Sequence, residues 1–394
     1  MNNKTVLSIL GRRLRLAVIG GGPESFIGGI HRMAARLDDN YELVAGVLSS
    51  NPETAVSRGI QMGIDKDRSY PTVEIMLKTE KQRADGADVI AVMTPNDTHF
   101  EYSMSALDYG FDVICDKPMT NTVEQAVALH KKVKTSKRIF CLTHNYTGYP
   151  MTRQARAMVA AGELGIIRLV QVEYVQGGKA DESKPDPLSG PRSWKFDPEK
   201  GGPSLVMGDI GTHAHNLVRF ITSLEINEVC AEAGAIVPNR KVDDYAGALL
   251  RLENGARGSF WVTQAAAGVE NSLKIRVSGS KGSLEWLQEI PQILTFKPLG
   301  SPIQIRTPNG PGTLPLSKRS SRIVAGHPEG FPEGFANIYS DAGEAIASRI
   351  ADTKVDPLTM HFPNSEDGLA GVLFVDAVLR SSNNNSTWEK VFNN

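Results

Sequence analysis

The stretch Leu14-Arg-Leu-Ala-Val-Ile-Gly-Gly-Gly22 decides how the first part of the chain folds. Residues 14–19 form a short aliphatic run that ends at glycines, which is typical of a buried strand. Backbone without side chains can approach a pyrophosphate closely, and a helix that follows offers its N-terminal amides. The spacing is irregular, because five residues separate Gly22 from Gly28. Gly20, Gly22 and Gly28 predict a dinucleotide site, and a plain tight turn is the alternative for an isolated glycine cluster.

Helices and strands alternate downstream of this stretch. The further predicted strands span 41–48, 88–93, 112–115 and 138–142, and the predicted helices span 30–37, 73–81, 99–109 and 122–133. Such alternation implies right-handed βαβ units and a parallel sheet that is covered on both faces. We therefore expect residues 1–145 to form a doubly wound Rossmann domain.

Strands dominate the rest of the chain, which is too long at 394 residues for one hydrophobic core. After a predicted helix at 152–161, the predicted strands span 167–175, 228–236, 244–252, 258–264, 273–279, 282–287 and 292–297. We expect residues 146–394 to form an α+β domain with a large, mostly antiparallel open sheet. Two stretches rich in proline and glycine, 176–202 and 298–334, are expected to act as lids or contact arms.

The composition excludes several classes of protein. With 41% hydrophobic and 22% charged residues and a net charge of −1, the chain is neither disordered nor attractive to nucleic acid. Three scattered cysteines predict neither disulfides nor a zinc site, so we expect no metal and a reducing cytoplasm. No apolar run is long enough to span a membrane. Arg12-Arg13 leaves twin-arginine export as an alternative, although the apolar stretch behind it is short.

Polar motifs follow three of the predicted parallel strands. Thr94-Pro95-Asn96 follows strand 88–93 and Asp116-Lys117-Pro118 follows strand 112–115, and open α/β sheets bind ligands at these carboxyl ends. Ser49-Ser50 ends strand 41–48, where a dinucleotide domain usually carries an acid for the adenosine ribose. The missing acid permits NADP without requiring it, and no arginine adjoins the serines. The sequence therefore predicts NAD or NADP without deciding between them.

Taken together, these motifs resemble the Gfo/Idh/MocA family of sugar and inositol dehydrogenases, over essentially the whole chain. The motifs that carry the resemblance are the glycines Gly20, Gly22 and Gly28 with His31, Thr94-Pro95-Asn96 with His99, and Asp116-Lys117-Pro118. The resemblance implies that these residues, except His31 and Pro118, contact the cofactor. It also implies that Lys117 lies between the nicotinamide and the reacting carbon, where its ammonium hydrogen-bonds the substrate oxygen. The family's third motif usually begins with Glu, and Asp116 is one methylene shorter.

Residues 204–222 carry a second candidate group. If this segment is helical, Asp209, His213 and Asn216 share one face, and His215 points elsewhere. Alcohol oxidation needs a base, and histidine titrates in the right range. The resemblance implies that Asp209 and His213 are the substrate-binding and proton-transfer pair, with His213 serving the same substrate oxygen as Lys117. A structural helix with a hydrogen-bonded histidine is the alternative, and a metal site is a weaker one because the rings of His213 and His215 diverge.

Three further residues are candidates for substrate binding. Trp194 and Lys195 end the first long loop, and an indole face suits the C–H surface of a sugar, although a tryptophan that plugs the domain interface is an equal alternative. Tyr146 lies in a stretch that replaces an arginine-containing segment common in the family. Arg153 and Arg156 are expected to be solvated helix residues.

The sequence thus predicts an NAD(P)-dependent dehydrogenase acting on CH–OH groups, with a small sugar, glycoside or cyclitol as substrate. Two alternatives keep the fold: a dinucleotide-binding sensor without turnover, and a reductase of biliverdin-like or imine substrates. Lys117, Asp209 and His213 argue against the sensor, since a sensor needs no proton relay. We also expect a homodimer or homotetramer, because apolar residues on both faces of the second sheet need cover.

Overall fold

The chain crosses between two separately packed units at residues 148/149, 330/331 and 369/370. The structure is a computed structural model that describes residues 5–184, 186 and 193–392. The first unit lies within Met1–Gly148 and Phe331–Leu369, and the second within Tyr149–Gly330 and Ala370–Asn394. Among the described residues, no helix is both long enough and apolar enough to cross a membrane.

The first unit contains a parallel sheet with the strand order β2-β1-β3-β4-β5. Its strands are β1 (Leu14–Gly20), β2 (Tyr41–Val47), β3 (Val89–Met93), β4 (Asp112–Cys115) and β5 (Phe140–Leu142). Every residue of β3, β4 and β5 is buried, as expected for strands that are covered on both faces. The predicted doubly wound parallel sheet is confirmed. The order reverses between β1 and β3, which is where such sheets bind dinucleotides.

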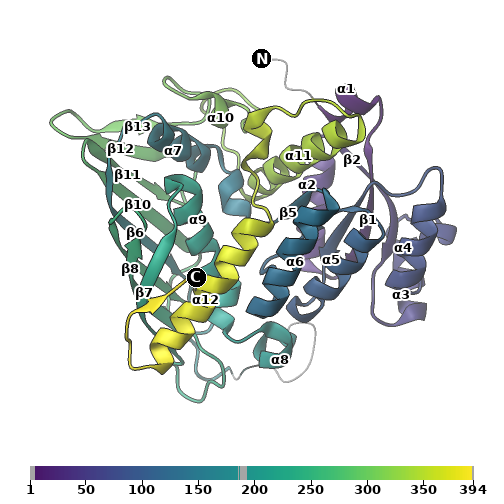
Figure 1. Ribbon diagram of the computed structural model, residues 1–394, viewed down its shortest axis with the longest axis horizontal. Coiled ribbons are helices and arrows are strands. Elements are labelled where there is room, and N and C mark those ends of the chain that lie inside the picture. Colours follow the sequence, from purple (N-terminus) through teal and green to yellow (C-terminus); the bar gives the residue numbers. More distant parts are fainter. Residues whose placement is uncertain (1–4, 185, 187–192, 393–394) are drawn as a thin grey trace. The chain divides into compact units, whose positions relative to one another are not determined.

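Helices cover both faces of this sheet. They are α1 (Val6–Leu10), α2 (Phe26–Leu37), α3 (Pro52–Gln61), α4 (Val73–Gln82), α5 (His99–Asp108), α6 (Val123–Ser136) and α11 (Phe331–Ile350), with short turns η1 (Lys66–Arg68), η2 (Asn96–Thr98), η3 (Asn145–Gly148) and η6 (Pro357–His361). Helices α5 and α6 pack side by side, and α2 packs against α11 (Figure 1).

Helix α11 belongs to the first unit, whereas the sequence analysis assigned residues 331–369 to the second domain. Phe335, Ile338, Tyr339 and Ala342 of α11 are buried in the core cluster that also contains residues of α2 and of the sheet. The helix begins at Phe331, inside the stretch 298–334 that was predicted to be a lid or arm. Burial of an apolar helix face against the sheet explains why this segment returns to the first unit.

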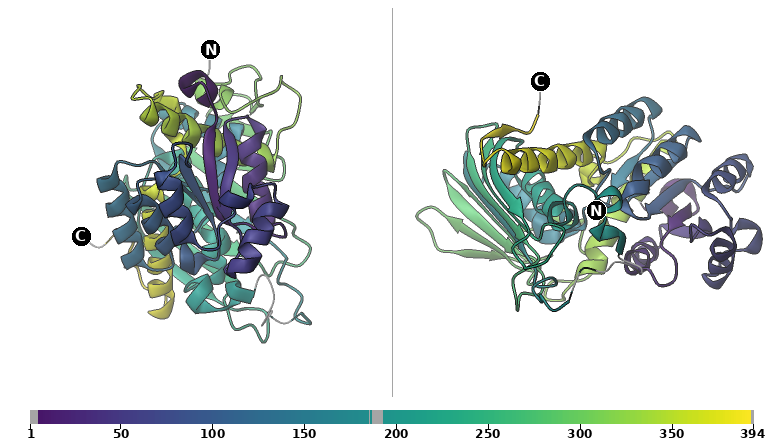
Figure 2. Two further views of the ribbon diagram at one scale, coloured as in Figure 1. Left: turned by 90° about the vertical axis from the view of Figure 1, so that its right-hand side faces the viewer. Right: turned by 90° about the horizontal axis from the view of Figure 1, so that it is seen from below.

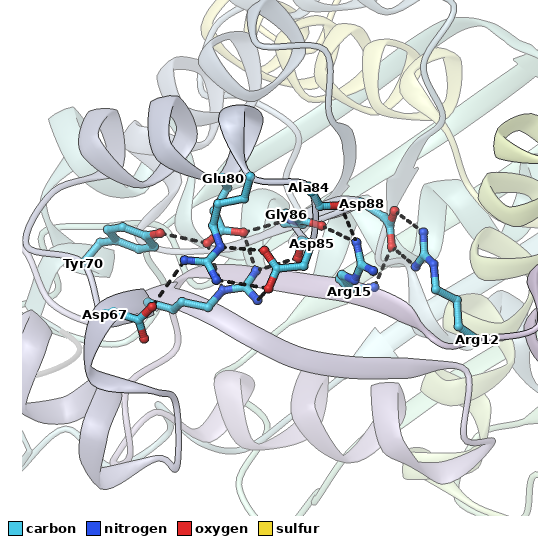
Figure 3. A network of polar contacts seen from close by, with 12 residues as sticks. Arg12, Arg15, Asp67, Tyr70, Glu80, Ala84, Asp85, Gly86 and Asp88 are labelled. Atoms are coloured by element: carbon cyan, nitrogen blue, oxygen red, sulfur yellow. Dashed lines mark hydrogen bonds and ion pairs between the residues drawn. The ribbon is translucent and has the colours of Figure 1, made fainter.

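A polar network fixes the edge of the first sheet opposite the strand ends described below (Figure 3). Asp88, just before β3, accepts hydrogen bonds from Arg12 and from the backbone amide of Arg15 on β1 at 2.8 Å. The buried Glu80 carboxylate accepts from Tyr70 at 2.9 Å and from Arg68 at 3.0 Å. Each of these two acids is therefore paired with donors. This network holds α4 and the loops at the amino ends of the strands, and we assign it a structural role.

The second unit contains a large sheet. Within the described residues its strand order is β13-β12-β11-β10-β6-β9-β8-β7-β14. The strands are β6 (Ile167–Val175), β7 (Ile226–Gly234), β8 (Tyr245–Leu252), β9 (Arg257–Thr263), β10 (Ser272–Gly279), β11 (Gly282–Leu287), β12 (Leu294–Pro298), β13 (Gln304–Arg306) and β14 (Glu389–Lys390). All neighbouring strands are antiparallel except β6 and β9, which run parallel. The predicted mostly antiparallel sheet is confirmed.

Helices of the second unit lie on one face of this sheet (Figure 2). They are α7 (Pro150–Ala160), α9 (Thr212–Thr222) and the part of α12 (Ser365–Asn383) from Ala370 onward, with the shorter elements η4 (Ser193–Phe196), α8 (Pro198–Gly201), η5 (Met207–Gly211) and α10 (Pro315–Lys318). Within the described chain, the other face carries no helix. Leu169, Leu249 and Trp261 are exposed, and the strand registers and the burial pattern place all three on this face. Of the predicted loop 176–202, residues 185 and 187–192 lie outside the described part.

Candidate active site

The glycine turn after β1 is shaped by close backbone contacts. Gly20 and Gly21 have φ angles of 79° and 66°, in the left-handed region that favours glycine. A Cβ on Gly21 would lie 2.2 Å from Met93 Sδ, and one on Gly28 would lie 2.4 Å from Gly21 Cα. No side chain fits at either position. The turn thus presents bare backbone at the carboxyl end of β1, which fits the pyrophosphate of a dinucleotide.

The irregular glycine spacing has a local explanation. The Ser25 side chain caps α2 by accepting from the amide of Gly28 at 3.1 Å, so the helix begins at Phe26 rather than at residue 30 as predicted. The residues between Gly22 and Phe26 form a longer entry loop, and Gly28 lies in the first turn of the helix. Gly28 therefore performs the close packing that the third glycine of the regular motif performs.

Thr94, Pro95 and Asn96 lie beside the glycine turn. A Cβ on Gly20 would lie 2.7 Å from Thr94 Cγ2, so the two strand ends are in direct contact. The Thr98 hydroxyl contacts Thr94 Oγ1 at 2.7 Å and donates to Pro95 O at 2.8 Å, which fixes the turn before α5. The structure brings the glycines and this motif together at one edge of the first sheet.

The end of β2 differs from the prediction in one respect. Ser49 Oγ accepts from the amide of Asn51 at 3.1 Å, whereas Ser50 is exposed. Arg58 on α3 reaches back to the glycine turn, and its Nη1 lies 3.6 Å from the Cβ position of Gly22. Arg58 was not predicted, because it does not adjoin the serines and no helix was expected at 52–61. It is helix α3 that brings Arg58 back to the glycine turn.

Asp116 and Lys117 follow β4 at the same edge. Asp116 Oδ1 accepts from the amide of Lys117 at 2.9 Å and from the Thr143 hydroxyl at 2.9 Å. Burial alone would raise the pKa of Asp116, but His31, Lys117 and His99 stabilise its charged form and hold its pKa well below the ordinary value. An ionised Asp116 thus fixes the backbone from which the Lys117 side chain extends. The Lys117–Pro118 peptide bond is cis.

Two buried histidines surround this turn. His31 Nδ1 lies 2.7 Å from the Tyr339 hydroxyl, and its Nε2 lies 4.0 Å from Asp116 Oδ1. His99 Nδ1 lies 2.7 Å from Pro118 O, and its Nε2 lies 2.9 Å from Thr94 O. Both rings are fully buried. His99 therefore links the Thr94-Pro95-Asn96 and Asp116-Lys117-Pro118 motifs, which follow the neighbouring strands β3 and β4.

Tyr146 lies in the first unit, not at the start of the second as predicted. It belongs to η3, is buried, and its ring centroid lies 6.4 Å from that of Phe331 at the start of α11. The packing of α11 on this turn accounts for the difference.

Asp209 lies in a π-helical turn, not in a regular α-helix. In η5 the amide of Thr212 donates to the carbonyl of Met207, five residues earlier, and α9 follows with His213 in its first turn. Single π-turns inside helices are frequent at functional sites because they change the direction of side chains. His213 is almost fully buried, and its ring centroid lies 6.4 Å from that of Tyr174 on β6. His215 does point elsewhere, stacking on Phe374 at 4.5 Å.

The Asp209 carboxylate accepts hydrogen bonds from residues that are distant in the sequence. Lys195 Nζ donates to Oδ1 at 2.8 Å, and Gln264 Nε2 donates to Oδ2 at 3.0 Å. The structure thus brings together Asp209 and Lys195, which were predicted independently. Trp194 adjoins this pair, with Lys195 Nζ 5.8 Å from its ring centroid.

Side-chain amides that were not predicted surround this pair. Gln264 Nε2 also donates to Gln176 Oε1 at 3.1 Å, and Asn271 Oδ1 accepts from Gln176 Nε2 at 2.6 Å and from the Tyr174 hydroxyl at 2.8 Å. Gln176 and Gln264 each follow a strand, β6 and β9, and these two strands are parallel neighbours. The position of Gln176 and Gln264, each directly after an apolar strand, was the sequence feature that could have indicated these amides. The parallel pairing of the two strands was not predicted.

Lys179 is a further cation near Asp209. Its Nζ is buried and has no hydrogen-bond partner in the described structure, and it lies 4.5 Å from the ring centroid of Phe196. Burial lowers the pKa of Lys179 to about 8, although the charges of Asp209, Asp186 and Asp243 act in the opposite direction.

Arg153 and Arg156 were predicted to be solvated, and this is wrong. Arg153 is fully buried, and its Nη1 donates to Ser320 Oγ at 2.9 Å, because α10 packs on α7 and covers it. Arg156 donates to Phe220 O, and its guanidinium lies 5.0 Å from the Phe220 ring centroid. Both arginines tie α7 to neighbouring elements of the second unit.

Comparisons with known proteins agree with this geometry. Residues 14–144 match the oxidoreductase family with an NAD-binding Rossmann fold, and residues 152–285 match the GFO/IDH/MocA C-terminal domain. An inositol dehydrogenase homologue from Azotobacter vinelandii, solved with NADH and myo-inositol, is 33% identical with a TM-score of 0.88, covering 97% of this chain and 98% of that one.

Two curated relatives are also similar. The uncharacterized oxidoreductase YfiI of Bacillus subtilis is 32% identical over 96% of this chain and 97% of its own length. Levoglucosan dehydrogenase of Pseudarthrobacter phenanthrenivorans is 26% identical over 69% of this chain and 73% of its own. The chain belongs to the Gfo/Idh/MocA family of oxidoreductases, with an NAD-binding Rossmann domain.

Proposed function

We propose that this protein is an NAD(P)-dependent dehydrogenase that oxidises a secondary hydroxyl carbon of a sugar, glycoside or cyclitol. The observation that carries the proposal is the Asp116-Lys117 turn. It lies at the glycine-lined edge of the first sheet, with the Asp116 carboxylate held ionised and the Lys117 backbone fixed to it. The relatives named for inositol and levoglucosan support the substrate class.

The residues of the first unit would hold the cofactor. The bare backbone of Gly20, Gly22 and Gly28 suits the pyrophosphate, and the end of β2 with Ser49 and Ser50 suits the adenosine ribose. Thr94, Pro95, Asn96 and Asp116 form the adjoining strand ends, with His99 and Lys117 beside them. When bound, the nicotinamide accepts or supplies the hydride, and the protein supplies position and charge.

The chain's own residues handle the substrate hydroxyl. His213 takes the hydroxyl proton as the carbon loses its hydride, and returns it in the reverse direction. The Lys117 ammonium hydrogen-bonds the same oxygen, whose charge changes during the transfer. Asp209, oriented by Lys195 and Gln264, accepts from a neighbouring hydroxyl of the substrate. Tyr146 and Trp194 remain proposed substrate-binding residues, the latter through its indole face.

The direct test is a panel of sugars, glycosides and inositols with NAD and with NADP, in which the absorbance of the reduced cofactor is followed. We expect turnover of at least one polyol, and His213→Ala should lower that turnover by about 10² to 10⁴ with little change in cofactor affinity. Cofactor binding without turnover across the panel would favour a sensor instead. Turnover confined to imine or biliverdin-like compounds would favour the alternative reductase.

A further inference from the structure

The contacts of His99 require more hydrogens than a neutral imidazole carries. Nδ1 lies 2.7 Å from Pro118 O and Nε2 lies 2.9 Å from Thr94 O, and both partners are backbone carbonyls. A carbonyl oxygen only accepts, so each ring nitrogen must donate for both contacts to be hydrogen bonds. A neutral imidazole has one N–H group and could satisfy only one carbonyl. The ring is fully buried, so bulk water does not supply the missing donor.

We propose that His99 is held as the imidazolium and acts as a positioning residue, clamping the Lys117-Pro118 turn to the Thr94-Pro95 turn. The first turn carries the residue proposed to contact the substrate oxygen, and the second adjoins Gly20. The His99 ring thereby sets the distance between these two turns, both of which lie at the proposed cofactor-binding site. Because both nitrogens are occupied by backbone, His99 acts through these turns and not through a hydrogen bond to the cofactor.

The surroundings can support a buried positive charge. Asp116 is the nearby anion, and the charge of His99 is one of the influences that keep the pKa of Asp116 low. Other titratable or charged groups on the neighbouring segments include His31 on α2, Asp97 on η2, Glu101 and Tyr102 on α5, Cys115 at the end of β4 and Lys117 just after it. Burial raises the pKa of the Cys115 thiol, which stays neutral. A buried cation next to an ionised and hydrogen-bonded carboxylate satisfies the requirement that buried charges be paired.

Loss of the ring proton would release one of the two carbonyls. Either Pro118 O or Thr94 O would then be a buried acceptor without a donor, which is unfavourable. The two turns would no longer be held together, and the backbone that positions the Lys117 side chain would no longer be fixed. The importance of this for catalysis rests on the proposed function, whereas the clamp itself does not.

The protonation state can be measured directly by NMR on the full chain labelled with ¹⁵N. Long-range ¹H–¹⁵N spectra distinguish the imidazolium from the two neutral tautomers, and His99→Gln assigns the His99 signals by difference. We expect imidazolium signals from His99 at neutral pH. His130 serves as an internal comparison, because burial lowers its pKa and it should be neutral at the same pH. A neutral tautomer of His99 at neutral pH would overturn the proposal. If His99→Gln does not fold, the other seven of the eight histidines are substituted one at a time. Their signals are then assigned, and the signal that is left belongs to His99.

A matched pair of variants tests the clamp. The side-chain amide of His99→Gln still offers two N–H donors, whereas His99→Met offers none. We expect His99→Met to bind NAD about tenfold more weakly, with partial rescue in His99→Gln. NAD affinity is measured by calorimetry, so the result does not depend on activity. Unchanged NAD affinity and unchanged turnover in folded His99→Met would refute the clamp. Imidazolium signals with no polyol oxidised would leave the clamp standing and count against the proposed function alone.

Discussion

Lys195 holds the Asp209 carboxylate from a different segment of the second unit, with Nζ 2.8 Å from Oδ1. Both side chains are partly exposed, at 31% and 25%, so the pair contributes little to the free energy of unfolding. Its effect should be on orientation of the carboxylate. We predict that Lys195→Met lowers kcat/KM by about 10- to 100-fold while the melting temperature changes little. Lys200→Met, which removes a lysine near the exposed Asp197, is the control. Equal kcat/KM in the two variants would refute the role of Lys195.

Cofactor choice should depend on Arg58. Its guanidinium lies beside Gly22 and near the end of β2, where the adenosine ribose of a dinucleotide binds. We predict a modest NAD preference in the wild type, and a loss of NADP affinity in Arg58→Ala that exceeds the loss of NAD affinity. Fluorescence titration with both cofactors measures this, with Arg36→Ala on the exposed face of α2 as control. A wild-type preference for NADP beyond about 100-fold, roughly 2.7 kcal/mol, would contradict the prediction.

Lys179 should make stability depend on pH. Its pKa is lowered from 10.5 to about 8 by burial, so below pH 8 the buried ammonium destabilises the folded state. Between about pH 8 and pH 10.5 Lys179 is protonated in the unfolded chain but neutral in the folded protein. The contribution of this group to the free energy of unfolding therefore rises with pH over this range. We predict that Lys179→Met stabilises the protein by about 1 to 3 kcal/mol at neutral pH. The stabilisation that the contact between the Lys179 ammonium and the Phe196 ring provides is lost in the variant and reduces this gain.

The gain from Lys179→Met should shrink as the pH rises above 8, because the wild-type lysine then loses its charge. Urea unfolding of the variant and the wild type at neutral and alkaline pH measures the difference. Lys184→Met, at a lysine that is 82% exposed, should show no such trend. A gain that is absent at neutral pH or constant with pH would show that the lysine is not destabilising in the folded state.

The helix-free face of the second sheet should mediate self-association. Leu169, Leu249 and Trp261 are exposed there on the adjacent strands β6, β8 and β9, and a two-fold partner would cover them symmetrically. We predict a dimer or tetramer by light scattering at micromolar concentration, and a shift toward monomer in the double variant Leu249→Lys, Trp261→Lys. A wild type with the mass of a single chain would contradict this.

The sequence predicted elements whose signal is local. The alternation of 167–175 and the apolar run of 112–115 define strands β6 and β4 with the observed bounds. The alternation of strands and helices was enough to place Gly20, Thr94 and Asp116 at the carboxyl ends of parallel strands. Contacts between distant segments could not be predicted in this way. Gln176 and Gln264 are neighbours only because β6 and β9 pair in parallel, and Arg153 is buried only because α10 packs on α7.

Deviations from regular helices could not be predicted from the sequence either. The expectation that Asp209 and His213 share one face assumed a regular α-helix, but Asp209 lies in a π-turn. Helix α11 was missed because a stretch rich in proline and glycine runs into it, and its burial depends on a core formed by residues more than 200 positions earlier, such as Leu16 and Val18.

The kinetics of Lys117→Met show whether the Lys117 ammonium stabilises charge on the substrate oxygen. The substitution removes the ammonium and keeps the stem, so the turn fixed by Asp116 should persist. With a substrate from the panel, we predict that kcat and kcat/KM fall by similar factors while NAD affinity is retained. The fall should correspond to a loss of about 2 to 4 kcal/mol of transition-state stabilisation. Wild-type kcat in folded, NAD-binding Lys117→Met would show that the Lys117 ammonium does not stabilise charge on the substrate oxygen.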